Sequence, residues 1–159
     1  EKKSKSVWGI VLKVIVTVVT ALAGVFGKPP AYTDADITLI IIHCSATPQG
    51  VRLSFDDVGG ITSATVASMT LIHRGRPYER IGAHCRNHNR HSLGICYEGG
   101  LIASGQPADT RTLHQKASLV ALLRELKRVF PRALIVGHHD LNPMKNCPCF
   151  DAAKEYREL

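Results

Sequence analysis

The hydrophobic residues that follow position 36 form short blocks, separated by polar loops, in a pattern typical of an α/β protein. Ile37–Ile42 is a continuous β-branched run that is too short for an ordinary helix. It predicts a strand buried on both faces. Ser92–Tyr97 and Ala133–Val136 predict two further buried strands, and Ala64–Ile72 predicts a weaker strand or a hairpin.

The segment between Thr112 and Pro131 has the periodicity of an amphipathic helix. Thr112 is a suitable N-cap residue, and Pro131 ends the helix. Asp151–Leu159 predicts a short closing helix. Strands with a helix packed on them predict an α/β domain with a mixed central sheet flanked by helices. The apolar positions recur at three- and four-residue steps, at Leu113, Ala117, Val120, Ala121, Leu123, Leu126, Val129 and Phe130.

The N-terminus has a basic leader, EKKSKS, followed by an apolar segment, Val7–Phe26, which predicts an N-terminal hydrophobic helix. Its 20 residues are about the length that crosses a hydrocarbon core. Ala21-Leu22-Ala23 has the small-x-small form of a signal-peptidase site. Residues 1–27 are therefore expected to be a signal peptide or a membrane anchor, and both remain open. A buried core helix is the other alternative, but it leaves the basic leader unexplained.

The N-terminal segment also accounts for much of the net charge of +7. Residues 1–30 contain five lysines and one glutamate, which leaves only +3 for the rest of the chain. That remainder has no basic stripe interleaved with aromatic residues, so no nucleic-acid partner is expected. Lys28-Pro29-Pro30 predicts a linker over 28–35. We expect residues 36–159 to form one domain, periplasmic or extracellular, either secreted or tethered by membrane contact through the N-terminal segment.

The chain has five cysteines, an odd number at irregular spacing that does not predict a disulfide-stapled scaffold. Cys44 and Cys96 lie inside strand-like runs, where a cysteine is expected to act as a small buried apolar residue. Cys147 and Cys149 flank Pro148 in a polar loop, and this setting suits reactive or metal-binding thiols better.

Two predicted buried strands end at histidines, His43 and His138. Residues that follow neighbouring strands of an α/β sheet converge at one edge, even when they are far apart in sequence. Cys147 lies nine positions after His138 and offers a third ligand. Two imidazoles and one thiolate form a catalytic zinc set with an open fourth position. Cys149 is an alternative ligand that spacing alone leaves open, and a site with both thiolates would be closed and structural.

Three motifs in order resemble the zinc-dependent N-acetylmuramoyl-L-alanine amidases, the family of phage amidase-lysozymes and peptidoglycan recognition proteins. The motifs are IIIHCSAT at 40–47, GAHCRNHNRHSLGICYEGG at 82–100 and GHHDLNPMKNCPCFD at 137–151. The resemblance implies a Zn²⁺-dependent hydrolase that cuts the amide bond between N-acetylmuramic acid and L-alanine in peptidoglycan.

Carried over position by position, the resemblance also implies roles for single residues. The metal ligands fall on His43, His138 and Cys147, which leaves Cys149 outside the coordination sphere. The active-site lysine of the family falls on Lys145, which is therefore the expected catalytic residue. His84 matches a histidine that lines the substrate cleft and is the expected substrate-binding residue.

The chain departs from the family pattern between the first two motifs. The family has a helix there, followed by a strand that opens with a catalytic tyrosine. Here the region near 54–60 is too short for that helix, and the tyrosine position falls on Thr62. Two functions therefore remain open: a zinc amidase that works without the usual tyrosine, and a catalytically impaired zinc-containing module that binds peptidoglycan. The sequence does not indicate an oligomeric state.

Overall fold

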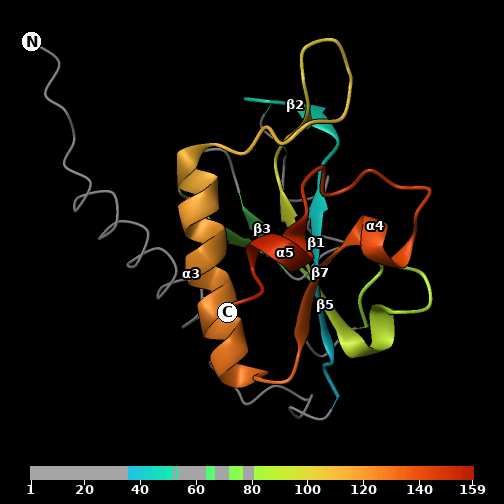
Figure 1. The fold of residues 1–159 in the computed structure, drawn as a ribbon, viewed down its shortest axis with the longest axis vertical. Helices are drawn as coiled ribbons and strands as arrows, with labels where there is room; N and C mark the ends of the chain where they lie inside the picture. Colours follow the sequence, from blue (N-terminus) through green and yellow to red (C-terminus); the bar gives the residue numbers. More distant parts are fainter. Residues whose placement is uncertain (1–35, 52, 54–63, 67–71, 77–80) are drawn as a thin grey trace, which may run out of the picture.

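The computed structural model describes residues 36–51, 53, 64–66, 72–76 and 81–159 (Figure 1). The predictions for residues 1–27, for the linker 28–35, for the helix missing near 54–60 and for Thr62 lie outside the described residues. Within the described ranges, no helix is both long enough and apolar enough to cross a membrane.

The core of the fold is a five-stranded mixed sheet. The central strand β1 pairs in parallel with β5 on one side and with β7 on the other. β3 pairs in parallel with β5, and β4 pairs with β3 in the antiparallel direction. The strands lie in the order β4 (Ile72–Arg74), β3 (Ala64–Val66), β5 (Ser92–Tyr97), β1 (Leu39–Cys44) and β7 (Leu134–Gly137).

Shorter elements surround this sheet. β2 (Thr47–Pro48) and β6 (Gly100–Leu101) form a separate parallel pair beyond the carboxyl ends of β1 and β5. The helical elements are η1 (Asn89–His91), α3 (Leu113–Val129), α4 (His138–Leu141) and α5 (Ala152–Glu155). The predicted α/β class with a mixed central sheet flanked by helices is confirmed.

Helix α3 begins with a capping box at the predicted N-cap. The Thr112 hydroxyl accepts the Gln115 N–H at 3.1 Å, and the Gln115 side chain accepts the Thr112 N–H at 2.9 Å. The buried face differs from the prediction, because Leu113 is 85% exposed and Gln115 is fully buried. Gln115 takes the core position because its amide donates to the Glu98 carbonyl at 2.8 Å. The buried side chains are Gln115, Ser118, Leu119, Leu122, Leu123 and Leu126.

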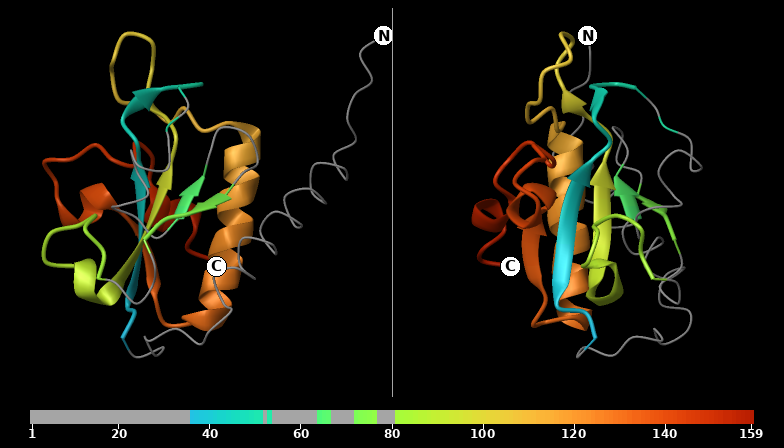
Figure 2. Two further views of the ribbon diagram at one scale, coloured as in Figure 1. Left: turned by 180° about the vertical axis from the view of Figure 1, so that it is seen from behind. Right: turned by 90° about the vertical axis from the view of Figure 1, so that its right-hand side faces the viewer.

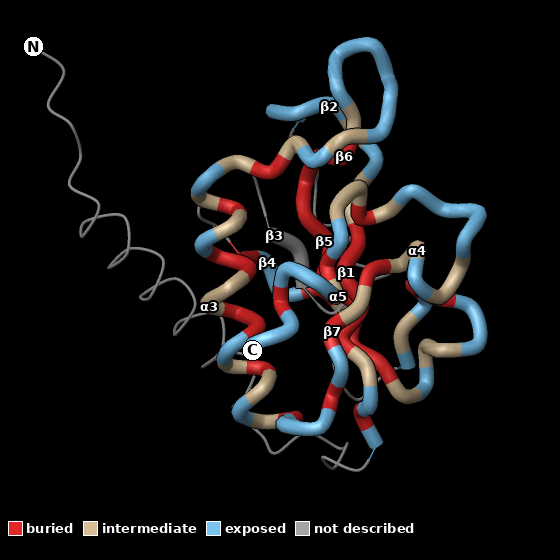
Figure 3. Tube along the Cα trace, in the orientation of Figure 1, coloured by how far each residue is buried: buried red, intermediate tan, exposed pale blue. Residues whose placement is uncertain are grey.

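The two faces of the sheet have different functions. Successive strand residues point to opposite faces, so Ile40 and Ile42 lie on one face of β1 while Ile41 and His43 lie on the other. Ile40 and Ile42 belong to the main core cluster, together with side chains of α3 and α5. Figure 2 shows α3 covering that face, and Figure 3 shows burial running through β1, β5 and one side of α3. His43 therefore projects on the face away from α3.

Strand β1 is displaced along the chain from the predicted Ile37–Ile42. Its pairing with β5 continues through His43 opposite Cys96 and Cys44 opposite Tyr97. The sequence pattern ended the strand at the first polar residue, but the partner strand extends far enough to keep His43 in the ladder. His43 is consequently held by the sheet and is not part of a loop.

Candidate metal centre

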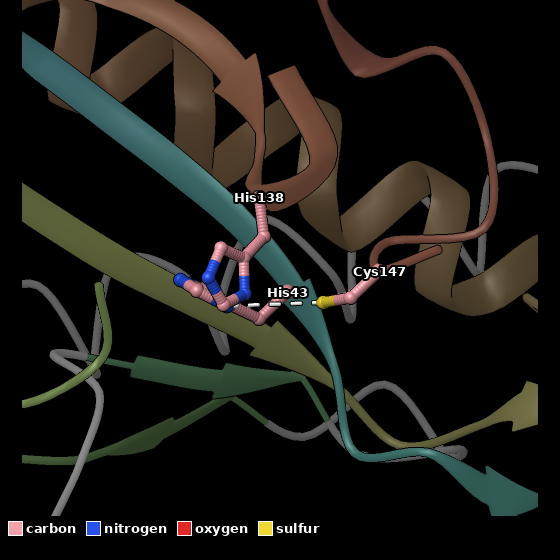
Figure 4. A group of neighbouring side chains, drawn as sticks. All are labelled: His43, His138 and Cys147. Carbon is pink, nitrogen blue, oxygen red and sulfur yellow. Dashed lines mark hydrogen bonds between the residues drawn. The ribbon is translucent and has the colours of Figure 1, made fainter. Parts of the chain in front are cut away.

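Three side chains from separate parts of the chain meet beyond the carboxyl end of the sheet (Figure 4). His43 comes from β1, His138 begins α4 directly after β7, and Cys147 comes from the following loop. Their potential ligand atoms all lie within 4.8 Å of one another. The Nδ1 atom of His43 is 3.8 Å from Sγ of Cys147, and the rings of His43 and His138 are 4.6 Å apart.

Adjacent parallel strands explain why the two histidines meet. β1 and β7 are neighbours in register, with Ile42 opposite Gly137, so the residues that follow lie side by side. The turn into α4 is fixed by Asp140, whose carboxylate accepts the Gly137 N–H at 2.7 Å. Asn142 donates its N–H to the His138 carbonyl at 3.0 Å and closes the helix.

The loop that carries Cys147 is held against β1 by hydrogen bonds on both sides of the thiol. The Cys44 N–H points at Sγ of Cys147 at 3.1 Å, and the His139 N–H donates to the Cys147 carbonyl at 2.8 Å. The buried Tyr97 hydroxyl donates to the Pro148 carbonyl at 2.6 Å. The thiol position is therefore set by the sheet and not by the loop alone.

The environment keeps the imidazoles neutral, as metal ligation requires. Burial, followed by the charges of His84 and His138, lowers the pKa of His43 to about 2. Burial lowers the pKa of His138, and the nearby charge of Lys145 adds to this effect. The hydrogen bond with the Cys44 thiol, followed by burial, raises the pKa of the Cys147 thiol, although the Cys44 N–H acts in the opposite direction. Ligation as a thiolate therefore needs a cation to displace the proton.

A chain of hydrogen bonds behind His43 fixes which nitrogen faces the other ligands. The Ser92 hydroxyl donates its one proton to the His88 carbonyl at 2.6 Å, so it accepts from Nε2 of His84 at 3.3 Å. Nδ1 of His84 then carries no proton and accepts from Nε2 of His43 at 3.0 Å. The lone pair of His43 is thereby left on Nδ1, the atom that faces Cys147.

Comparison with known proteins gives the same assignment as the geometry. The sequence profile of the N-acetylmuramoyl-L-alanine amidase family matches residues 33–150, and a family of unknown function matches residues 2–28. The chain belongs to the N-acetylmuramoyl-L-alanine amidase family. The predicted family and enzyme class are therefore confirmed.

Individual relatives of this amidase support the family assignment. It is 39% identical over 122 residues to an endolysin of Enterobacteria phage K11, a match that covers 69% of this chain and 79% of the relative. Its fold resembles the amidase LysC of Clostridium intestinale, with a TM-score of 0.62, 21% identity, and coverage of 76% and 81%. It also resembles bumblebee PGRP-SA, with a TM-score of 0.60, 18% identity, and coverage of 82% and 86%.

The donor set of the amidase suits a divalent metal ion such as zinc. Tetrahedral zinc with nitrogen and sulfur ligands places neighbouring donor atoms about 3.3–3.6 Å apart. The separation between Nδ1 of His43 and Sγ of Cys147 is 3.8 Å, and all three donor atoms lie within 4.8 Å of one another, so inward movement of the side chains is needed to reach that geometry. In the part of the chain that the structure describes, this is the one group of three or more potential ligands. Cys149 is not a member of this group, and its Sγ lies 3.7 Å from Sγ of Cys44.

The other two predicted site residues occupy contrasting positions. Lys145 is exposed in the loop between α4 and Cys147, and its N–H donates to the Asn142 carbonyl at 2.9 Å. His84 is buried, burial lowers its pKa to about 4, and both its ring nitrogens face protein partners. Substrate contact by His84 stays a prediction, and the contact that the structure shows is its hydrogen bond with Nε2 of His43.

Sequence reasoning missed the residues that orient His43. The sequence pattern predicts Ser92 only as the start of a strand. Gly94 makes room for the His84 ring, because a Cβ atom at this position would lie 2.6 Å from Cγ of His84. A glycine inside the apolar run Ser92–Tyr97 was the available signal, since such a glycine often marks a close approach.

Proposed function

We propose that this chain is a zinc-dependent amidase that hydrolyses the bond between N-acetylmuramic acid and L-alanine in peptidoglycan. The observation that carries the proposal is that His43, His138 and Cys147 lie close together at the carboxyl ends of β1 and β7, in a chain of the amidase family. The relatives that are similar to this chain in sequence include phage endolysins, which supports peptidoglycan as the partner. The site of action is then periplasmic or extracellular, where that polymer lies.

Each residue of the metal centre has a separate role in the proposed amide hydrolysis. When bound, zinc supplies the Lewis acid that polarises the amide carbonyl and activates water. His43 and His138 contribute neutral imidazoles, and Cys147 contributes the anionic ligand that partly balances the positive charge. Ser92 and His84 hold His43 in the tautomer that presents Nδ1.

Lys145 supplies a second positive charge in this proposal. Attack on an amide places negative charge on the carbonyl oxygen, and a cation beside that oxygen stabilises the transition state. Lys145 lies two residues before Cys147, and its positive charge contributes to the lowered pKa of His138. An exposed lysine in a loop anchored to the metal centre is positioned to meet the substrate as it enters.

A direct assay decides between the amidase and the impaired binding module that Thr62 suggests. The zinc-loaded full chain is incubated with purified peptidoglycan, and new L-alanine amino termini are counted. Release above that of a chelator-treated sample is expected. If the chain sediments with peptidoglycan but releases no new amino termini, the binding module replaces the amidase.

Replacing Ser92 with alanine is expected to weaken zinc binding about 10-fold, because partners that orient a metal-ligating histidine typically contribute this much. Without the hydroxyl, Nε2 of His84 loses its acceptor, and the tautomers of His84 and His43 are no longer fixed. Zinc affinity is measured by competition with a chelator, and the tautomers are read from ¹⁵N shifts of the imidazoles.

The matched variant Ser92→Thr keeps the hydroxyl and should retain both the affinity and the tautomers. Ser92 is buried, so a general packing defect would affect the threonine variant at least as strongly. Unchanged tautomers and affinity in Ser92→Ala would contradict the assigned role.

A further inference from the structure

We propose that Cys44 and Cys149 are a modification site, at which a disulfide oxidant forms a reversible cross-link between β1 and the loop of the metal centre. Their Sγ atoms lie 3.7 Å apart, although 105 positions separate the residues in sequence. Both side chains are half-buried. This inference goes beyond the proposed hydrolysis and does not depend on it.

The alternation of β1 directs the Cys44 side chain to the face opposite His43. His43 and Cys44 are consecutive strand residues, so their side chains leave opposite faces of the sheet. Cys147 and Cys149 both lie next to the carboxyl end of β1, but their thiols have different neighbours. Sγ of Cys147 lies 3.8 Å from Nδ1 of His43, whereas Sγ of Cys149 lies against Cys44. The Cys44 thiol also contacts the Cys147 thiol, but neither Cys44 nor Cys149 belongs to the group of potential metal ligands, so a Cys44–Cys149 cross-link uses none of them.

Gly100 provides the space in which the two sulfur atoms meet. A Cβ atom at this position would lie 2.6 Å from Sγ of Cys44 and 3.6 Å from Sγ of Cys149. The Gly100 backbone has φ +101°, a conformation that favours glycine, and its carbonyl accepts from the Cys149 thiol at 3.3 Å. A side chain at position 100 would therefore occupy the space that the Cys44 sulfur now fills.

The backbone of Cys149 is held in an unusual conformation that directs its side chain to Cys44. Its φ of +69° lies in the left-handed region, which is unfavourable for a residue other than glycine. The Cys149 N–H donates to the Asn146 carbonyl and Tyr97 holds the preceding carbonyl, so the surroundings impose the conformation. In this conformation the Cys149 thiol faces the Cys44 thiol.

The chemistry of the cross-link balances with a small disulfide as the oxidant. The thiolate of one cysteine attacks oxidised glutathione and releases one glutathione thiol. The second cysteine then displaces the other glutathione from the mixed disulfide. The protein loses two hydrogen atoms and gains one S–S bond, and two glutathione thiols are formed. The sulfur atoms must approach from 3.7 Å to about 2.05 Å for the bond to form.

The cross-link would fasten the carboxyl end of β1 to the loop that presents Lys145 and Cys147. A bond across 105 positions removes much of the freedom of the unfolded chain. Oxidation should therefore raise the thermal midpoint by about 10 °C. The benefit arises where disulfide oxidants are present, which agrees with the expected location outside the cytoplasm.

The test incubates the zinc-loaded full chain with oxidised glutathione, blocks the remaining thiols with N-ethylmaleimide and maps the peptides without reduction. One Cys44–Cys149 cross-link is expected, with the zinc content unchanged and the thermal midpoint raised until dithiothreitol reverses the change. Cys149→Ser should bind zinc but show neither the cross-link nor the shift. Cys96→Ser, which removes a buried thiol of the other face, should keep both.

Other results overturn the proposal. A Cys44–Cys147 cross-link with loss of zinc would show that the metal ligand is the true partner, since the Cys44 N–H already lies 3.1 Å from its sulfur. Stable glutathione adducts without a cross-link would show that the two sulfur atoms cannot meet. The same mapping on chelator-treated protein keeps the test independent of the zinc proposal, because the cross-link is expected there even if the chain never holds zinc.

Discussion

Replacing Cys147 with serine is expected to lower the zinc affinity of this chain at least about 100-fold and to abolish amidase activity. The thiolate is the only anionic member of the ligand group, and soft sulfur ligands favour zinc over the hard oxygen of serine. Loss of a direct ligand should exceed the 10- to 100-fold effect of removing a residue that only orients one. Zinc affinity is measured by chelator competition under reducing conditions, and activity by release of L-alanine amino termini.

The chain contains its own control for this experiment in Cys149. Cys149→Ser makes the same chemical change two residues away, on the side of β1 where the sulfur faces Cys44 and not the metal centre. It should keep zinc affinity and activity under reducing conditions. Loss of zinc from Cys149→Ser with retention in Cys147→Ser would exchange the two assignments and imply that Cys149 is the ligand.

Strand β5 could be predicted well because its burial is continuous, whereas β7 is shifted by one residue from its prediction and exposes Leu134. Ser92–Tyr97 is predicted and observed with the same bounds, and all six residues are buried. The bounds of β1 were less predictable, because the strand extends through His43 to remain paired with Tyr97 and its neighbours. A polar residue can remain inside a strand when the adjacent strand continues, and a single segment of sequence does not contain that information.

The buried face of α3 was predicted less well, for a related reason. Apolar periodicity placed Leu113 in the core, yet the structure exposes it and buries Gln115. The choice depends on a hydrogen bond to the Glu98 carbonyl, a group that lies 17 positions away. Hydropathy cannot identify a buried amide whose partner is supplied by tertiary structure.

The metal centre shows the same division between local and tertiary information. His43, His138 and Cys147 could be proposed from strand ends and residue chemistry, because parallel neighbours bring those ends together. The hydrogen bond from His43 to His84 could not be proposed in the same way. It belongs to a chain of hydrogen bonds that runs from Ser92 through His84 to His43, and only the folded structure brings these residues together. The partnership of Cys44 with Cys149 was missed as well, because Cys44 resembled an ordinary buried strand cysteine.

Replacing Lys145 with alanine is expected to lower the hydrolysis rate by about 10²–10³ while leaving zinc content and folding unchanged. Removal of one charge-stabilising donor costs about 2.7–4 kcal/mol in the transition state. The side chain is exposed in a loop, so its truncation should change the free energy of unfolding by no more than about 0.5 kcal/mol. The rate on peptidoglycan, the zinc content and the thermal midpoint are measured on the same preparation.

Lys154 provides the matched control, because it is another exposed lysine in the same C-terminal segment and is not adjacent to a metal ligand. Lys154→Ala removes the same charge and should keep the rate of the unaltered chain. Lys145→Arg should recover part of the rate, since it restores a cation with different geometry. Equal rate losses in Lys145→Ala and Lys154→Ala would indicate that only the net charge attracts the polymer. An unchanged rate in Lys145→Ala would remove Lys145 from the mechanism and leave the metal centre to stabilise the oxyanion without it.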